Sequence, residues 1–561
     1  MDMHSLCQRQ QEIMDELKII AYMKKGSITY QRLATKQEGA SAGSGYGPYP
    51  VLTWKEKGRT RSLRLKTPED VAWAEAAVEN YRRGAALWRE YEELAEQRAF
   101  AIRAGEDNPT DEAKKNAEIV AETQAEVSRV LHSALQAGDY DLEAVESSVR
   151  AAMLEGGKGL LGQFMTQAGA ASSEQAVTCP QCRLPMKGTG RRDKQVLTIL
   201  GHLTYTRSRY QCPKCRRVRF PGDEALDLAA TSRSPGVRRQ IARLGAKEPF
   251  HEVATDMREL AGLAVSRKDA ERIAEGIGLD IETKDRRQRM RIRHQPLPLV
   301  DTPKTIDTLY IEIDGTGVPM VEGELQGRKG KQSDGSAKTR EVKLGCVFTQ
   351  SAIHDKGRSI RDPNSTTFTG GIENAEAFGQ RIYAEAVRQG LFHAKRVVVL
   401  SDTAEWIRNI VAMYFPMALH IIDFYHAKEH INTLCKELFV HPNDAIHHRR
   451  LWWDCLAQGN IETIIEQAAA CLPNFPGACK TAQREIQYLR KNAHLMRYAT
   501  FKNKGLFIGS GVIEAACKTI VAQRLKQSAM KWTVQGANAI IALRCNILSG
   551  LFTDYWDQRA A

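Results

Sequence analysis

The sequence predicts a mixed α/β fold for the C-terminal half of the chain, preceded by a small cysteine-bearing β-module and a helical region. Three segments from residue 306 onward have strand character: LYIEIDGTGVPMV, TREVKLGCVFT and STTFTGGI. The amphipathic helix NAEAFGQRIYAEAVRQG then ends at Gly390, and the apolar runs RVVVLSD and ALHIID follow it. Continuous apolar runs are typical of strands that are covered on both faces. This order of elements predicts one mixed sheet between layers of helices.

The charge balance favours a polyanionic partner. Across 561 residues, 80 Lys and Arg face 67 Asp and Glu, which leaves a net charge of +13. Basic side chains displace the counterions that condense around DNA phosphates. No apolar run approaches the roughly 20 residues that span a bilayer, and the segment MDMHSLCQRQQEIMDELK lacks the apolar core of a secretory signal. We therefore expect a cytoplasmic protein without membrane contact, in which disulfide bonds are not expected.

The N-terminal part predicts a small strand-plus-helix domain over residues 1–95. GSITYQRL, GYGPYPVLTW and GRTRSLRL read as strands, and Lys57-Gly58 suits a hairpin turn. Pro68 suits the first turn of a helix, and Ala/Glu-rich helix continues to about residue 165 before the linker-like QAGAASSEQA. Residues 96–176 are therefore expected to be a helical segment and linker.

Two CPxC motifs over residues 177–222 predict a structural zinc ribbon. Tetrahedral zinc takes four thiolates, and two such turns across a hairpin supply them. The predicted ligands are Cys179, Cys182, Cys212 and Cys215. The other cysteines show no ligand spacing and are interpreted as small buried side chains; they are Cys7, Cys346, Cys435, Cys455, Cys471, Cys479, Cys517 and Cys545.

Basic residues surround the four cysteines and face only Asp193 as an acidic counterweight. Some of them balance the charge of a zinc–thiolate centre, but their number favours a DNA-binding surface over a solvated face. The candidate DNA contacts in this module are Lys187, Arg191, Arg192, Lys194, Arg207, Arg209, Arg216 and Arg217. Downstream, residues 223–300 read as short helices with a break at LAVS, which fits a helix-turn-helix and also fits a plain helical connector.

Three acids occupy settings suited to two-metal phosphodiester chemistry. Asp314 lies in the first strand before small residues, Asp402 ends an apolar run, and Glu514 lies in the first turn of a later helix. Ser510 is the candidate N-cap of that helix. Two-metal cleavage needs carboxylates that converge from separate elements onto ions roughly 3.5–4 Å apart. Taken singly, each acid also suits a cap or a helix-dipole contact.

The chain from about residue 177 resembles the ISKra family of bacterial insertion-sequence transposases. The matching segments are CPQC, CPKC, LYIEIDGTGVPMV, GKQSDGSAKTREVKLGCVFT, VVVLSDTAEWI, HIIDFYHAKEH, GLFIGSGVIEAACKTIVAQRLKQSAMKWT and GANAIIALRCNILSG. The resemblance implies a ribonuclease H-like core of DDE type, two catalytic Mg²⁺ ions that Mn²⁺ replaces, and cleavage and joining of DNA at transposon ends. Carried over by motif, the triad is Asp314, Asp402 and Glu514. The N-terminal segment resembles a small bacterial domain of unknown role.

The motif HIIDFYH adds two candidate catalytic residues. Asp423 and His426 resemble the DxxH signature of the wider Mutator-like group, in which His426 would orient a phosphate or water. The alternatives are a structural hydrogen bond at the strand end and Asp423 as second metal ligand in place of Asp402. Fold order favours Asp402, because its strand follows the first helix.

The long interval before Glu514 predicts a helical insertion. Residues 431–499 are expected to form it, and residues 301–430 and 500–561 the catalytic domain. Trp452 and Trp453 suit core packing better than stacking on an unpaired base. Basic residues flank the acids, and the candidate DNA contacts among them are Lys338, Arg340, Arg524 and Lys526.

The sequence therefore predicts a transposase that binds double-stranded DNA at transposon ends and target, as a homodimer or higher oligomer, because two ends must be paired. A domesticated, non-catalytic DNA-binding protein or repressor is the main alternative. A host nuclease of ribonuclease H type is disfavoured by the zinc module and the insertion. A zinc hydrolase is disfavoured because four cysteines close the metal site.

Overall fold

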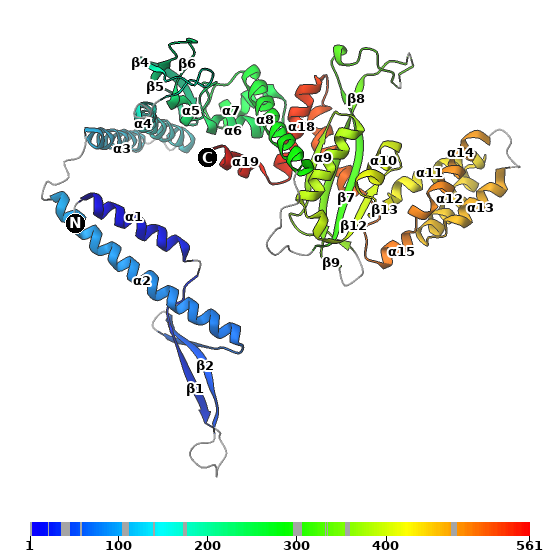
Figure 1. The fold of residues 1–561 in the computed structure, drawn as a ribbon, viewed down its shortest axis with the longest axis horizontal. Helices are drawn as coiled ribbons and strands as arrows, with labels where there is room; N and C mark the ends of the chain where they lie inside the picture. Colours follow the sequence, from blue (N-terminus) through cyan, green and yellow to red (C-terminus); the bar gives the residue numbers. More distant parts are fainter. Residues whose placement is uncertain are drawn as a thin grey trace. The chain divides into compact units, whose positions relative to one another are not determined.

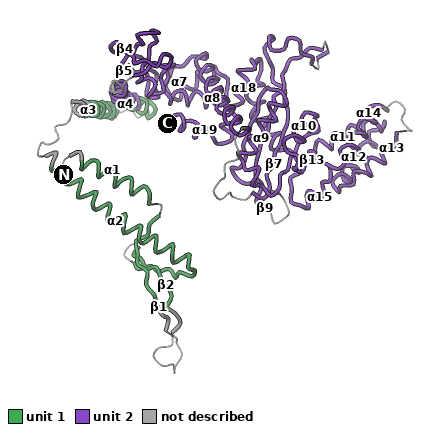
Figure 2. The backbone as a smooth tube through the Cα atoms, in the orientation of Figure 1, with its two compact units in different colours: residues 1–149 green, residues 150–561 purple. Residues whose placement is uncertain are grey.

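The computed structural model divides the chain into two compact units, residues 1–149 and 150–561, which Figure 2 shows in different colours. Each unit is described by itself. The described residues are 3–20, 22–34, 45–56, 59–103, 111–137, 141–171, 177–294, 306–330, 332–333, 335–353, 359–472 and 479–560.

The first unit is built on one long helix. Its elements are α1 (Met3–Ile19), β1 (Ser27–Ala34), β2 (Gly45–Glu56), β3 (Arg59–Arg64), α2 (Pro68–Arg103), α3 (Asp111–Ala137) and the start of α4 (Leu142–Ala171). Leu6 and Ile13 of α1 pack on Leu87 and Leu94 of α2. The predicted strands form an antiparallel sheet in the order β1-β2-β3. Pairing of Glu56 with Arg59 suits the predicted two-residue turn, whose Lys57 and Gly58 lie outside the described residues.

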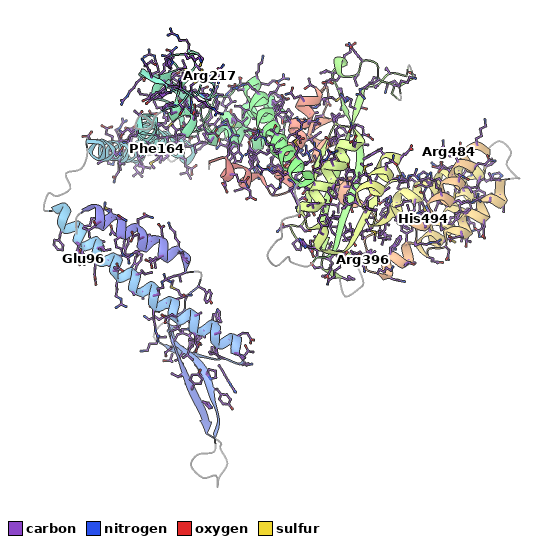
Figure 3. The ribbon with its side chains drawn as sticks, in the orientation of Figure 1. Glu96, Phe164, Arg217, Arg396, Arg484 and His494 are labelled. Carbon is purple, nitrogen blue, oxygen red and sulfur yellow. The ribbon has the colours of Figure 1, made fainter. Side chains whose placement is uncertain are left out.

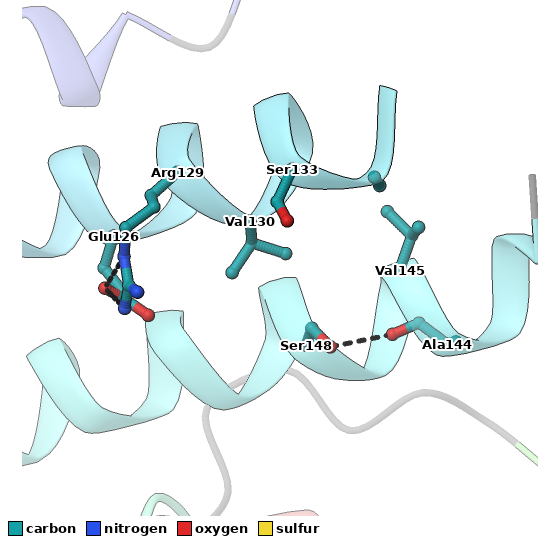
Figure 4. A pocket seen from close by; sticks show the side chains of 8 residues that line it. Glu126, Arg129, Val130, Ser133, Ala144, Val145 and Ser148 are labelled. Carbon is teal, nitrogen blue, oxygen red and sulfur yellow. Dashed lines mark hydrogen bonds and ion pairs between the residues drawn. The ribbon is translucent and has the colours of Figure 1, made fainter. Parts of the chain in front are cut away.

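A shallow pocket of about 370 Å³ separates α3 from α4 (Figure 4). Glu126 and Arg129 form an ion pair within one turn of α3 at its edge. The remaining lining residues are small and mostly apolar: Val130, Ser133, Ala134, Ala144, Val145 and Ser148. None of the candidate site residues lines this pocket.

The second unit begins with the cysteine-bearing module. An antiparallel sheet is formed by β4 (Lys187–Thr198), β5 (Gly201–Gln211) and β6 (Val218–Arg219). The later part of α4 covers it, with Met165 packed among Val196, Leu203 and Tyr205. The predicted hairpin between the two CPxC motifs is therefore confirmed. α4 extends to Ala171, into the segment expected to be a linker at 167–176, and the rest of that segment lies outside the described residues.

Four helices lead from the module to the large sheet: α5 (Pro221–Ala225), α6 (Pro235–Gly245), α7 (Phe250–Glu259) and α8 (Arg267–His294). The break after α7 matches the predicted one, but α8 is much longer than the short helix expected there. A Cβ added at Gly278 of α8 would lie 2.0 Å from the carbonyl oxygen of Ala539. Glycine at this position lets α8 cross closely over α18 (Val534–Leu548), so α8 is an integral part of the core.

The large sheet is mixed, as predicted. Its strands are β7 (Ile306–Pro319), β8 (Thr339–Gln350), β11 (Thr367–Gly371), β12 (Ala394–Ser401) and β13 (Leu419–Ile422). They lie in the order β11-β8-β7-β12-β13. β8 is antiparallel to both β7 and β11, whereas β12 is parallel to β7 and β13. A separate short hairpin joins β9 (Ala352–Ile353) to β10 (Ser359–Ile360).

Helices cover both faces of this sheet (Figure 1). On one face, Ile311 and Ile313 of β7 pack with α9 (Ala375–Arg388) and α10 (Glu405–Tyr414). On the other, Tyr310 packs in the larger core that contains α8, α18 and the helix after Glu514. Because side chains alternate along a strand, Glu312 and Asp314 share the face of Tyr310. This alternation places Asp314 on the face of the sheet that the C-terminal helices cover.

A bundle of helices is inserted after β13 (Figure 1). Its members are α11 (Phe424–Leu438), α12 (Pro442–Ala457), α13 (Ile461–Cys471), α14 (Cys479–Asn492) and α15 (Tyr498–Asn503). α11 crosses the boundary expected at residue 431, so the insertion begins immediately after β13. Trp452 is fully buried and donates from Nε1 to Gln467 Oε1 at 2.8 Å, which confirms core packing for this side chain.

The chain ends with α19 (Phe552–Ala560), which packs through Phe552, Tyr555 and Trp556 into the larger core. Among the described residues, no single helix is long and apolar enough to cross a bilayer, although α18 and α19 meet those criteria together as a pair bent by 104°. Most of α18 is buried inside the protein.

Candidate active site and metal centre

Asp314 and Asp402 lie beside each other on neighbouring parallel strands. Ser401 of β12 pairs with Ile313 of β7, so the next residue on each strand is one of the two acids. Neighbouring strands are about 4.8 Å apart. Burial raises the pKa of Asp314, and the nearby charge of Asp402 raises it further. The two carboxyl groups therefore interact, although they are 88 positions apart in the sequence.

Glu514 approaches from a helix that packs on the same face. It lies in α16 (Gly511–Ala516) with an exposed side chain, and the helix continues as a π-helical stretch, Cys517–Ala522, before α17 (Gln523–Leu525). π-Turns within helices are frequent at functional sites. Cys517 lies three residues beyond Glu514 and donates from Sγ to Asp314 Oδ2 at 3.3 Å. This thiol was expected to be a simple packing residue, and it instead connects the helix of Glu514 to the strand of Asp314.

In the described part of the chain, Asp314, Asp402 and Glu514 do not form a compact group of potential ligands. Among the described residues, only the four cysteines form a group of potential ligands whose atoms all lie within 4.8 Å of one another. Burial raises the pKa of Asp314, and repulsion by the nearby carboxylate of Asp402 adds to this effect. Such repulsion is expected between carboxylates that would share a cation when the cation is absent.

The small residues after Asp314 leave room for neighbouring side chains. A Cβ added at Gly315 would lie 2.7 Å from Oε1 of Glu341 on β8. Glu341 is a further acid beside Asp314, and Lys343 donates to its other oxygen at 2.6 Å. Thr316 accepts a hydrogen bond from Lys526 Nζ at 2.6 Å. The absence of a side chain at Gly315 therefore makes room for a second carboxylate, and Lys526 brings a positive charge close to Asp314.

Asp423 is fully engaged in hydrogen bonds within the protein. It is only 2% exposed, and its Oδ1 accepts the backbone N–H of His426 at 2.6 Å, which caps α11. Its Oδ2 accepts the backbone N–H of Ser510 at 2.6 Å and the Ser510 hydroxyl at 3.0 Å. Asp423 therefore caps the N-terminus of α11 and also connects this helix to Ser510, in the segment before α16. Ser510 occupies the predicted N-cap position but makes no side-chain cap bond; its hydroxyl donates to Asp423 and lies 3.4 Å from Oε1 of Glu514.

A buried acid that the sequence interpretation did not single out lies two residues before Asp314. Glu312 is 0% exposed, and its Oε2 accepts the backbone N–H of Ile513 at 2.8 Å. Its Oε1 is buried without a hydrogen-bond partner among the described residues. Burial raises the pKa of Glu312 to about 8. The sequence could have indicated a special role for Glu312, because it is an acid inside the apolar run LYIEI and a buried charge is costly unless it is compensated.

His426 belongs to a chain of contacts that reaches into the inserted bundle. Its Nε2 lies 3.2 Å from Nε2 of His430, one turn later on α11. His430 Nδ1 lies 2.5 Å from Oε2 of Glu485 on α14. The ring of Tyr488 stacks on His430 with centroids 3.7 Å apart. The four-residue spacing of the two histidines in HAKEH places them on one face of a helix, so the sequence could have indicated their contact. Nothing in the sequence indicated that Glu485 and Tyr488 lie beside them.

The four cysteines form the predicted cluster at the ends of two equivalent turns. In each CPxC turn, the residue after the second cysteine has positive φ, 55° at Arg183 and 62° at Arg216. The amide of Arg183 donates to Cys179 O at 2.8 Å and the amide of Arg216 to Cys212 O at 3.1 Å. This repetition brings all four sulfur atoms within 4.8 Å of one another.

The donor set fits zinc. Four thiolates at such spacing match a closed tetrahedral site. The backbone N–H of Cys182 lowers the pKa of the Cys179 thiol to about 6. The hydrogen bond between Cys182 and Cys215 raises the pKa of the Cys182 thiol to about 12. Binding of a divalent metal favours the thiolate form of the cysteines that hold it.

Some of the candidate DNA contacts around the cysteines are exposed and others are half-buried. The exposed ones are Lys187, Arg191, Arg192, Arg216 and Arg217; Arg217 is labelled in Figure 3. Lys194 and Arg207 are half-buried and form ion pairs with the buried Asp223, which also accepts from the Tyr205 hydroxyl at 2.5 Å. Their charges are therefore engaged inside the module, which argues against their assignment to the DNA surface. Arg209 is half-buried and donates to Thr189 Oγ1 at 2.8 Å.

The basic residues near the acids divide in the same way. Lys338 and Lys526 are exposed, and Arg340 is half-buried in an ion pair with Glu324 at 3.3 Å. Arg524 is 0% exposed, donates from Nε to Gly245 O at 2.9 Å and lies against aromatic rings of the core. The expectation that Arg524 contacts DNA is therefore wrong, because its guanidinium is inside the protein.

No family model matches the chain, and no curated protein matches it. Among solved structures, it aligns with the "Drosophila P element transposase strand transfer complex" at 10% sequence identity, over 60% of this chain and 83% of that one. The TM-score of that alignment is 0.22, a value at which it establishes neither a common fold nor a common activity.

Proposed function

We propose that the chain is a DDE transposase of a bacterial insertion sequence, with a ribonuclease H-like catalytic domain that cleaves and joins DNA. The observation that carries the proposal is the position of Asp314, which follows the partner of Ser401, the residue before Asp402, and accepts from Cys517, three residues beyond Glu514. Their order along the chain and the surrounding motifs resemble the ISKra family. A cytoplasmic location is part of the proposal.

The acid set suits two Mg²⁺ ions, which Mn²⁺ would replace. Carboxylate oxygens are the donors these hard cations prefer. The negative charges of Asp314 and Asp402 repel each other, and a bound cation would neutralise that repulsion. Such a metal pair supplies activation of the attacking oxygen and stabilisation of the leaving oxygen. Asp314, Asp402 and Glu514 would hold the ions. Asp423 is left out of this set because both of its oxygens already accept hydrogen bonds inside the protein.

Other side chains would handle the DNA itself. Lys526 is exposed beside Thr316 and suits a phosphate next to the metals. His426 would orient a phosphate or a water molecule. The exposed Lys and Arg residues of the zinc module, with Arg191, Arg192 and Arg217 among them, would bind the terminal inverted repeats. Pairing two ends would require at least a dimer.

The test is cleavage of DNA that carries the element's terminal inverted repeats, with Mg²⁺ or Mn²⁺, followed by mapping of the product ends. Asp314→Ala should abolish cleavage and keep DNA binding. Asp307→Ala is the matched control, because Asp307 is an exposed acid at the other end of β7. Cleavage by Asp314→Ala at the wild-type rate would overturn the proposal. Sequence-specific binding without any metal-dependent cleavage would support the repressor instead.

A further inference from the structure

The inserted bundle contributes side chains to the surroundings of the acids. Glu485, on α14, is 5% exposed, and its Oε2 lies 2.5 Å from Nδ1 of His430. Its other oxygen accepts from Arg484 at 3.3 Å. Tyr488, one turn later on α14, stacks on His430 and accepts a hydrogen bond from Thr403 Oγ1 at 3.1 Å. Because Thr403 follows Asp402 directly, α14 contacts both the DxxH helix and the turn of the second acid.

The hydrogen bonds define which ring nitrogen carries each proton. A carboxylate only accepts, so Nδ1 of His430 donates to Glu485. Burial lowers the pKa of His430 despite the opposing effect of Glu485, so this ring is neutral and its Nε2 is an acceptor. The 3.2 Å contact between the two Nε2 atoms then requires that His426 donates from Nε2. In neutral His426 the proton-free nitrogen is Nδ1.

Nδ1 of His426 has no hydrogen-bond partner in the described part of the chain. Glu429, an 80% exposed acid on the same helix, is 3.8 Å away, beyond hydrogen-bond range. This nitrogen is therefore available to accept a hydrogen bond from a water or hydroxyl group.

We infer that Glu485 and His430 are positioning residues that fix the tautomer of His426, so that His426 presents Nδ1 as an acceptor. The inference rests on the proposed function for the role of His426 in the reaction, but the tautomer itself does not depend on it. A second consequence is that the inserted bundle is part of the catalytic assembly, since it supplies the carboxylate that begins the chain of hydrogen bonds.

The direct test is the protonation of the two rings, measured from ¹⁵N chemical shifts in full-length protein labelled at histidine. The two signals are assigned by their loss in His426→Gln and His430→Gln. In the wild type, His430 should carry its proton on Nδ1 and His426 on Nε2. Glu485→Leu should remove this preference in both rings. Glu437→Leu, the same change at an exposed position of α11, should leave it intact. A mixture of tautomers at His426 in the wild type would overturn the inference.

The kinetic test is a double-mutant cycle on single-turnover cleavage of end-containing DNA. His426→Ala should slow cleavage about 100-fold, as loss of a proton-handling side chain does. Glu485→Leu should slow it about tenfold, as loss of a supporting hydrogen bond does. In the His426→Ala background, Glu485→Leu should have no further effect.

The outcomes separate the two proposals. If Glu485→Leu slows cleavage equally in both backgrounds, Glu485 acts through packing and the inference fails while the transposase stands. If the wild type cleaves no DNA yet shows the two tautomers, the proposed function fails and the positioning role is upheld by the ring protons alone.

Discussion

Glu312 on β7 accepts the backbone N–H of Ile513 at 2.8 Å, so a fully buried carboxyl group fixes the first turn of the helix that carries Glu514. Glu312 also lies on the same face of β7 as Asp314, two residues away. One side chain therefore ties the strand of the first candidate acid to the helix of the third. The geometry of the acid site depends on a residue that would not touch the metals.

This contact predicts an unusual pH dependence of stability. Burial raises the pKa of Glu312 from an ordinary 4.5 to about 8, so the folded protein holds a proton that the unfolded chain releases. A raised carboxyl pKa means that stability is lost as pH increases from about 4.5 to about 8. In Glu312→Gln, which keeps an acceptor for Ile513, the melting temperature should fall less over this interval than in the wild type. Glu322→Gln, at an exposed acid, is the control. An unchanged pH slope in Glu312→Gln would contradict the assignment.

Asp402 and Asp423 should respond differently to the same substitution. Asp402→Asn should abolish metal-dependent cleavage without loss of melting temperature, because it removes a like charge beside Asp314. Asp423→Asn should leave one of its two backbone donors, His426 or Ser510, without an acceptor in a buried position. That change should cost about 1–3 kcal/mol of stability. Cleavage and thermal unfolding measured on both variants decide the question. An inactive but fully stable Asp423→Asn would restore Asp423 as the second metal ligand.

The sequence could predict the strands of the large sheet and the cysteine turns because periodicity and motif spacing are local properties. It favoured Asp402 over Asp423 by fold order alone, since both follow apolar strands. Which strand lies next to β7 is a long-range property, and the register shows that this strand is β12, the one before Asp402. The ion pairs of Lys194 and Arg207 were missed for a similar reason. Their partner, Asp223, lies one residue beyond the predicted end of the module, so it was not counted among the acids facing them.

The contact between Glu485 and His430 joins residues 55 positions apart in the sequence, on helices whose packing no local pattern reveals. Arg524 illustrates the opposite error. Its position among basic residues favoured an exposed face. Arg524 lies four residues after Ile520 and three after Val521, however, so it shares the buried face of the helix.

The cysteine cluster should bind one zinc ion per chain and hold the module together. Elemental analysis of protein purified without chelator should give that ratio, and Cys212→Ser should lower it. Because binding of structural zinc is coupled to folding, loss of the metal should make residues 177–222 sensitive to protease while the large sheet resists. Cys471→Ser is the matched control, since Cys471 lies in the inserted bundle. Full zinc content in Cys212→Ser would show that the four cysteines are not the ligands.

The division of the basic residues into exposed and buried sets predicts two distinct phenotypes. The triple variant Arg191→Ala, Arg192→Ala and Arg217→Ala should bind DNA more weakly with unchanged stability, because these side chains are exposed. Each phosphate contact contributes about 0.9 to the slope of log affinity against log salt, so the slope should decrease by up to about 3. Arg207→Ala should act on stability instead, at about 1–3 kcal/mol, because it removes a partner of the buried Asp223. Titration of labelled DNA at several salt concentrations, with thermal unfolding of each variant, measures both.

If Arg207→Ala kept wild-type stability and reduced the salt slope, Arg207 would return to the DNA surface. An unchanged slope in the triple variant would place the DNA on another face of the protein.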